Sequence, residues 1–233
     1  MRSAEVSRSL SKKCASLSTY RTFTRHGRGA GLLMLLILAG CAGSGRTVPL
    51  DVVPKLPPAQ SVSSDPVKIV IEPFEDRRTD TTRLGLRTHL GGGVTYYNVA
   101  GGKAGETAAE TMAETLRQQG WQRQGWDARV VQSGVAVSGA DIIITGQLLD
   151  LAANAKSRFF STVITGESKM VIKAVNSKDD SSVTRHVEGA LTQTVFWFEN
   201  DDVRNLVGLA LRDGIERFIN DTKIDGGILK SVR

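Results

Sequence analysis

The sequence predicts an α+β fold, in which a mixed, mainly antiparallel sheet carries two amphipathic helices packed on one face and follows a disordered lipid tether. Three patterns predict this class. Residues 67–71 form a β-branched run that is typical of a buried strand. Residues 105–119 and 201–220 carry apolar side chains at helical spacing. In residues 159–198, two strand-like stretches flank a Ser- and Asp-rich turn, as in an antiparallel hairpin.

The first half of the predicted domain contains three strands and one helix. The strand at 67–71 stops before Pro73, because proline donates no hydrogen bond to a ladder. Further strands are expected around 84–87 and at 94–99, bounded by glycines. The helix at 105–119 is rich in good helix formers and is expected to end at the glycine that follows it.

The second half of the domain is expected to be a meander closed by a helix. Strands are predicted at 129–132, 140–151, 159–175 and 183–198, and the last two pair as the hairpin. The helix at 201–220 has a broad apolar stripe, and acidic residues at its start suit the positive end of the helix dipole.

The net charge of +6 comes from the N-terminus alone. Residues 1–40 hold seven of the 30 Lys and Arg residues and one of the 24 Asp and Glu residues, which leaves 23 of each from position 41 onward. A neutral remainder without a run of Lys or Arg argues against nucleic-acid binding, which depends on neutralising phosphates.

An export signal explains this charge distribution. A basic zone over residues 1–28 precedes an apolar run at 29–40. The run is too short to span a bilayer, which takes about 20 residues, and is typical of a secretory signal peptide.

The signal closes on a short motif that resembles the lipobox of bacterial lipoproteins, made of Leu38, Ala39, Gly40 and Cys41. The resemblance implies cleavage before Cys41 and acylation of its thiol, so the expected contact with the membrane is through acyl chains on Cys41. Because Ala42 and not Asp follows the cysteine, the resemblance also implies the outer membrane, with the domain facing the periplasm.

Four segments are therefore expected along the chain. They are a signal peptide at 1–40, a lipidated cysteine with a flexible Pro-rich tether at 41–66, a single α+β domain at 67–225 and a C-terminal tail at 226–233. The second cysteine, Cys14, leaves with the signal peptide. The mature domain is then expected to fold without a disulfide or a cysteine metal ligand.

Residue patterns for cofactors are missing from the mature sequence. His89 and His186 have no second His or Cys nearby, so neither a metal nor another cofactor is expected. The glycine-rich stretch at 91–105 departs from the phosphate-loop pattern at both ends. Anion binding at the start of the helix that follows it stays open.

The acidic residues after the first strand offer the clearest alternative to a binding role. A glycan hydrolase can be built from a pair among Glu72, Glu75, Asp76 and Asp80. Neighbouring arginines, however, are expected to keep these carboxylates ionised, which disfavours a general acid and favours a solvated or self-paired loop.

Aromatic residues cluster at three places in the predicted strands. Tyr96-Tyr97 and Phe196-Trp197-Phe198 put aromatic side chains on both faces, and Phe159-Phe160 begin another strand. One face is expected to be core. The other is either packed against a helix or exposed as a patch for a partner.

Two stretches resemble the YajG-type family of bacterial lipoproteins. Asp76, Arg77, Arg78, Thr79 and Asp80 resemble its Asp-x-Arg-Thr-Asp loop after the first strand. Residues 202–215 and 220–224 are similar to its closing helix and Asp-Thr-x-Ile tail. The resemblance implies a location and a fold but no catalytic residue, and the glycine-rich stretch at 91–105 departs from the family.

The expected function is that of a non-enzymatic binding or scaffold module, anchored by lipid in the cell envelope, with an envelope protein as its partner. A more distant similarity to periplasmic modules of envelope machines leaves a second possible function, that of an accessory lipoprotein of a transport system. A glycan hydrolase of the envelope is the third possible function.

Overall fold

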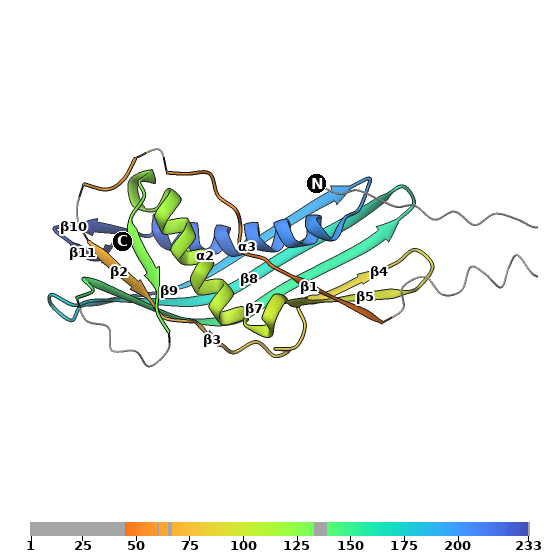
Figure 1. Ribbon diagram of the computed structural model, residues 1–233, viewed down its shortest axis with the longest axis horizontal. Helices are drawn as coiled ribbons and strands as arrows, with labels where there is room; N and C mark the ends of the chain where they lie inside the picture. Colours follow the sequence, from red (N-terminus) through yellow and green to blue (C-terminus); the bar gives the residue numbers. More distant parts are fainter. Residues whose placement is uncertain (1–44, 60, 65–66, 133–138, 233) are drawn as a thin grey trace, which may run out of the picture. The chain divides into compact units, whose positions relative to one another are not determined.

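The computed structural model describes residues 45–59, 61–64, 67–132 and 139–232. It confirms the predicted α+β class (Figure 1). The predicted lipobox, Leu38 to Cys41, lies outside the described residues.

The sheet is built around one long strand, β7 (Ile142–Arg158). Along one edge β7 pairs antiparallel with β8 (Ser161–Asn176), and β8 pairs antiparallel with β9 (Ser182–Val195). This confirms the predicted hairpin. The other edge of β7 takes three short parallel strands in turn: β2 (Lys68–Ile71), β3 (Glu75–Asp76) and β4 (Gly85–Thr88).

Shorter strands extend the sheet beyond β2 and β4. β6 (Asp127–Val130) pairs parallel with β2 at the end where β7 begins. β5 (Val94–Val99) pairs antiparallel with β4 at the end where β7 finishes, and β1 (Arg46–Leu50) pairs parallel with β5. Different strands, with the loops that connect them, therefore lie at the two ends of β7.

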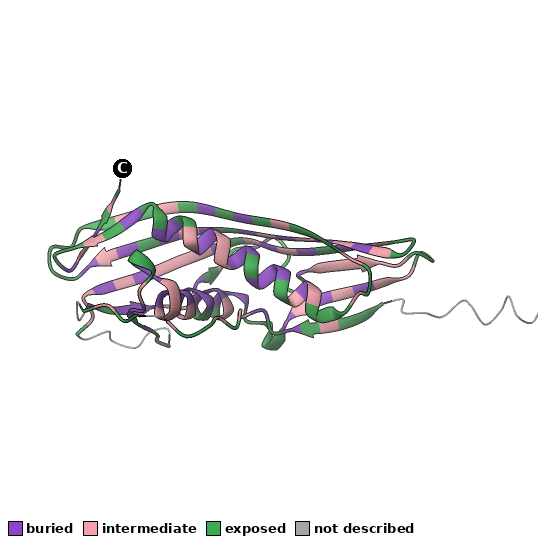
Figure 2. Cartoon of the chain, turned by 90° about the horizontal axis from the view of Figure 1, so that it is seen from above, coloured by how far each residue is buried: buried purple, intermediate pink, exposed green. Residues whose placement is uncertain are grey.

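Two helices, α2 (Ala104–Gln119) and α3 (Asn200–Asn220), cover the same face of the sheet (Figure 1). Buried residues recur at helical spacing along both, as Figure 2 shows. A capping box between Glu199 and Asp202 starts α3. No helix in the described part of the chain is both long and apolar enough to cross a membrane.

The segment predicted as a flexible tether, 41–66, contains a strand of the sheet. Residues 46–50 form β1, and Leu50 and Val52 are buried. Pro49 fits in β1 because this strand lies at the sheet edge, where one side of the backbone needs no ladder partner. Proline content therefore indicated a tether over residues 46–50, where the chain forms an edge strand.

The predicted C-terminal tail at 226–233 also belongs to the domain. β10 (Thr222–Asp225) and β11 (Ile228–Ser231) form an antiparallel hairpin. Its two-residue turn, Gly226-Gly227, has positive φ at both positions, which glycine adopts without strain. The side chain of Asn176 exchanges two hydrogen bonds with the backbone of buried Leu229, which ties the hairpin to β8.

The ends of the long strands also differ from the prediction. β7 runs seven residues beyond the predicted end at 151. Phe159 and Phe160 form the tight turn between β7 and β8 instead of starting a strand, and Phe196-Trp197-Phe198 lie beyond the end of β9. Alternation of side chains continues through β7 and β8 without marking where one strand ends, so the pattern did not locate the turn.

Tyr97 is the largest fully buried side chain, and its hydroxyl group has no hydrogen-bond partner among the described residues. Burial raises the pKa of Tyr97 to about 12, although the nearby charge of Arg87 opposes this. Because this pKa lies above the value of about 10 in an unfolded chain, ionisation of Tyr97 does not affect folding below pH 10, and it lowers the stability of the domain as the pH rises from 10 toward 12, where the unfolded chain releases the proton first.

We therefore expect Tyr97→Phe to stabilise the domain at pH 7 by about 1 kcal/mol, because it removes an unpaired buried hydroxyl group. The variant should also lose less stability than the wild type between pH 10 and pH 12. Urea unfolding at pH 7 and pH 11 measures both effects, with Tyr96→Phe as the partly exposed control. Equal alkaline losses in Tyr97→Phe and the wild type would contradict the prediction.

Candidate functional site

The motif loop after β3 is organised by one buried arginine. The Arg78 guanidinium donates two hydrogen bonds to the Asp76 carboxylate, at 2.9 Å from Nε and 2.8 Å from Nη2. It also donates to the carbonyl oxygens of Thr81 and Arg83. Its side chain is 4% exposed. The guanidinium therefore closes the loop from within.

Two carboxylates of the loop, those of Asp76 and Asp80, have a lowered pKa. Burial alone would raise the pKa of Asp76, but the hydrogen bonds and positive charge of Arg78 bring it below its ordinary value. Hydrogen bonds from the side chain and backbone of Thr82, and from the backbone of Arg83, lower the pKa of Asp80. Glu75 pairs with Arg77 at 2.9 Å on the surface. The loop thus has the self-paired form that the sequence favoured.

Thr79 is an exposed residue of this loop. The remaining candidates from the sequence lie on other segments. His89 contacts Thr95 at 2.8 Å, and His186 is exposed on β9. The glycines near 101 precede α2, where Lys103 pairs with Glu106. Among the described residues, no three His, Cys, Asp or Glu side chains gather as a metal site would require.

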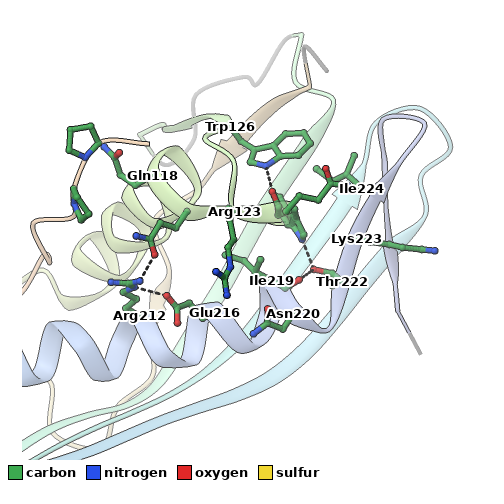
Figure 3. A pocket seen from close by; sticks show the side chains of 16 residues that line it. Gln118, Arg123, Trp126, Arg212, Glu216, Ile219, Asn220, Thr222, Lys223 and Ile224 are labelled. Carbon is green, nitrogen blue, oxygen red and sulfur yellow. Dashed lines mark hydrogen bonds and ion pairs between the residues drawn. The ribbon is translucent and has the colours of Figure 1, made fainter. Parts of the chain in front are cut away.

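A second candidate is a hollow of about 840 Å³ that the sequence did not indicate (Figure 3). It lies between the C-terminal ends of α2 and α3, the short helix η2 (Trp121–Arg123) and β10. We call it the polar hollow. The side chains that line it include Gln118, Arg123, Arg212, Glu216, Asn220 and Lys223.

Two tryptophans form a rigid wall of the polar hollow. Trp121 and Trp126 meet edge to face, with ring centroids 5.7 Å apart. The Trp121 indole donates to the Thr222 hydroxyl at 2.9 Å, and the Trp126 indole donates to the Trp121 carbonyl at 3.1 Å. Both rings are satisfied and buried, so this wall is fixed before any ligand arrives.

Two side chains of the polar hollow have polar groups without a hydrogen-bond partner among the described residues, whereas a third is paired. Arg212 is held by Glu216 at 2.6 Å and by Gln119. Arg123, in contrast, is exposed; its backbone N–H donates to the Gly120 carbonyl at 3.0 Å, but its guanidinium makes no hydrogen bond or ion pair with any residue in the described ranges. The Oε1 atom of Gln118 is buried and has no partner there either. The hollow therefore presents a free cation and a free acceptor.

The backbone of η2 is strained where it borders the polar hollow. Gln122 and Arg123 both have φ of 58°, in the left-handed region that costs about 1–2 kcal/mol for a residue with a side chain. Strain of this kind concentrates at functional sites.

We expect Gln122→Gly to raise the free energy of unfolding by about 0.5–1 kcal/mol, because glycine adopts this φ without a steric penalty. Gln124→Gly is the matched control. Gln124 has an extended backbone with φ of −103°, so its replacement should destabilise slightly. Thermal unfolding of the two variants checks this, and a destabilised Gln122→Gly would show that the turn is not strained.

A third candidate lies at the opposite end of the sheet, where β7 finishes. Four exposed aromatic side chains gather in two neighbouring turns: Phe159 (76% exposed), Phe160 (88%), Phe196 (78%) and Trp197 (91%). Together with exposed Leu90 in the β4–β5 turn, we call them the aromatic tip. The sequence did not decide which aromatic side chains are core and which are exposed. Tyr97 lies in the core. The Arg83 guanidinium packs over the Tyr96 ring, and the Arg87 guanidinium packs over the Phe198 ring.

Comparisons with known proteins do not show a family for this chain. No family model matches the chain, and no curated protein matches it. A solved structure of a Xanthomonas campestris protein of family DUF330 is 9% identical, with a TM-score of 0.41, over 76% of this chain and 89% of that one. A lipoprotein structure from Neisseria meningitidis is 12% identical, with a TM-score of 0.32, over 66% of this chain and 99% of that one. These matches do not confirm the YajG-type resemblance.

Proposed function

We propose that this chain is a lipid-anchored, periplasm-facing lipoprotein of the bacterial outer membrane, and that it acts as a non-enzymatic module whose polar hollow binds a protein partner of the envelope. The single observation that carries the proposal is the placement of the hollow. The described chain starts at Gly45, whose N–H donates to the Val94 carbonyl at 2.8 Å, at the end of the sheet where β7 finishes. The polar hollow lies at the other end, where β7 begins.

This arrangement suits a module anchored at Cys41. An acyl chain on Cys41, five residues before Arg46, holds the N-terminal end of β1 close to the lipid. The polar hollow then faces away from the anchor, toward the periplasm.

The chemistry of the hollow favours a peptide segment that carries a carboxylate. Arg123 supplies an unpaired guanidinium, which binds carboxylates in a bidentate geometry. The Gln118 Oε1 atom accepts an N–H from the same segment, and the Trp121–Trp126 wall gives an apolar surface beside both.

The anchor is tested by labelling cells with a radioactive fatty acid. Wild-type protein should incorporate the label, and Cys41→Ala should not. Label that persists in Cys41→Ala would reject the anchor. Fractionation of the wild-type envelope then tests the outer-membrane location.

The binding site is tested by photo-crosslinking in intact cells, with a photoreactive residue in place of Lys223 at the rim of the hollow. One discrete protein adduct is expected, and Arg123→Glu should abolish it. A photoreactive residue in place of His186, exposed on β9, is the matched control. The same adducts from both positions, or an adduct that survives Arg123→Glu, would reject the hollow as the site.

A further inference from the structure

We infer that the aromatic tip inserts into the lipid surface and forms a second membrane contact beside the acyl chains. The inference rests on the lipid anchor of the proposed function and adds an orientation for the domain. It concerns Leu90, Phe159, Phe160, Phe196 and Trp197, none of which belongs to the polar hollow.

Strand pairing brings these residues together. Thr162 of β8 pairs with Ser157 of β7 on one side and with Val195 of β9 on the other. Phe159-Phe160 and Phe196-Trp197 therefore project from the ends of neighbouring strands, and neighbouring strands in a sheet lie about 5 Å apart. On the other edge of β7, Thr88 pairs with Lys156, which brings the turn with Leu90 to the same end.

The lipid anchor reaches the same end of the sheet. Arg46 pairs with Thr95 beside the β4–β5 turn, so β1 starts next to Leu90. Cys41 precedes Arg46 by five residues, and an extended chain of that length spans at most about 17 Å. An acylated Cys41 therefore holds the lipid surface near the end of the sheet where the aromatic tip lies.

The composition of the tip fits a membrane interface. All four aromatic side chains that are largely exposed in the described part of the chain lie here. Phe and Trp at the end of a domain bury their rings at the level of the lipid head groups, whereas in water they form an unfavourable apolar patch.

The backbone at the tip also indicates a function beyond folding. Phe160 has φ of 60° in a two-residue turn, where glycine or asparagine is strongly preferred. A bulky aromatic in this conformation is a genuine outlier. Folding alone would favour glycine at this position, so the exposed ring of Phe160 is retained at a cost in stability.

Charges near the tip have both signs. Arg46 and Arg158 lie at this end, and so do Glu199 and Asp201 at the start of α3. Attraction to anionic lipids is thus partly cancelled, and the rings carry the contact. We therefore expect little dependence of the insertion on ionic strength.

Tryptophan fluorescence tests the inference directly, since Trp197 is exposed at the tip whereas Trp121 and Trp126 are buried at the far end. The mature protein, extracted from cell envelopes, is reconstituted into vesicles of phosphatidylethanolamine and phosphatidylglycerol with or without brominated acyl chains. Brominated lipid should quench part of the emission, and Trp197→Phe should remove that quenching. Quenching that is absent from the wild type, or that survives in Trp197→Phe, would overturn the inference.

A second variant shows whether weaker quenching reflects the loss of a ring at the tip or a loss of folding. Phe160→Gly relieves the backbone strain, so it should unfold at a higher urea concentration than the wild type. It should nevertheless show weaker quenching of Trp197, because one ring of the insertion is lost. Leu209→Ser, on the exposed side of α3, is the control and should leave quenching unchanged. Undiminished quenching in Phe160→Gly would contradict the inference.

The same samples separate this inference from the proposed function. Mass spectrometry of the mature N-terminus decides whether Cys41 is acylated, and quenching of Trp197 decides whether the tip meets lipid. Acylation without quenching overturns the inference about the tip and leaves the lipid anchor standing. If Trp197 is shielded only in native envelopes, the tip contacts a protein partner, and this result also overturns the inference. Quenching without acylation rejects the anchor and supports the tip.

Discussion

Arg78→Ala should lower the free energy of unfolding by about 3–5 kcal/mol, the largest loss expected for any single side chain in the motif loop. The substitution leaves the Asp76 carboxylate without its charged partner, and it strips the carbonyl oxygens of Thr81 and Arg83 of a donor. Because the Arg78 side chain is 4% exposed, water does not replace these bonds without opening the loop. Urea unfolding followed by circular dichroism measures the loss.

The control for Arg78 is its neighbour. Arg77 pairs with Glu75, but both side chains are 55% exposed, so Arg77→Ala should cost less than about 1 kcal/mol. Similar losses for the two variants would show that burial of the Arg78 guanidinium does not stabilise the loop.

Low pH should weaken the interaction between Asp76 and Arg78, because it protonates the Asp76 carboxylate. The lowered pKa of Asp76 means that its contribution is fully present above the unfolded value near 3.9 and is lost as the pH falls through the folded pKa. Asp76→Asn should therefore flatten the stability profile below pH 4. A profile identical to that of the wild type would reject the role of Asp76 in acid stability.

The sequence predicted the elements with strong local patterns. The apolar stripes of α2 and α3 and the β-branched run of β2 were located within one or two residues. Their signals are local, because each depends on side-chain spacing within a single segment. β1 and the β10–β11 hairpin were missed, since β1 depends on pairing with β5 and the hairpin on contacts with Asn176.

The candidate sites were predicted unevenly for the same reason. The self-pairing of Asp76 with Arg78 was foreseeable, because the two residues are neighbours in the chain. The polar hollow combines residues from two helix ends and β10, so no single stretch carries a signal for it. The turn of the aromatic tip was missed for another reason. Phenylalanine is common in strands and rare in the left-handed region, so the composition of Phe159-Phe160 predicted a strand where Phe160 has a positive φ.

Gly189→Ala should destabilise the domain by about 3 kcal/mol, through a clash between β9 and α3. A Cβ atom at position 189 would lie 1.9 Å from the Ala210 carbonyl oxygen and 2.8 Å from the Gly214 nitrogen. Both are backbone atoms, so no side chain can rotate away. The Ser168 hydroxyl, on β8 opposite Gly189, donates to the same Ala210 carbonyl at 2.9 Å and holds the helix against the sheet.

Gly91→Ala is the matched control, because a Cβ atom there meets nothing within 4 Å and its backbone is not left-handed. It should change stability by no more than about 1 kcal/mol, in the stabilising direction. Equal stabilities of the two variants would mean that α3 is free to lift from the sheet at Gly189.

The consequence of Gly189→Ala reaches both proposed contact surfaces, because α3 connects them. Trp197 of the aromatic tip precedes the first turn of α3, and Arg212 and Glu216 of the polar hollow lie on its last turns. A displaced α3 should therefore weaken the quenching of Trp197 by brominated lipid and the crosslink from position 223 together, whereas Phe160→Gly weakens only the first. Loss of one signal without the other in Gly189→Ala would show that the two ends of α3 move independently.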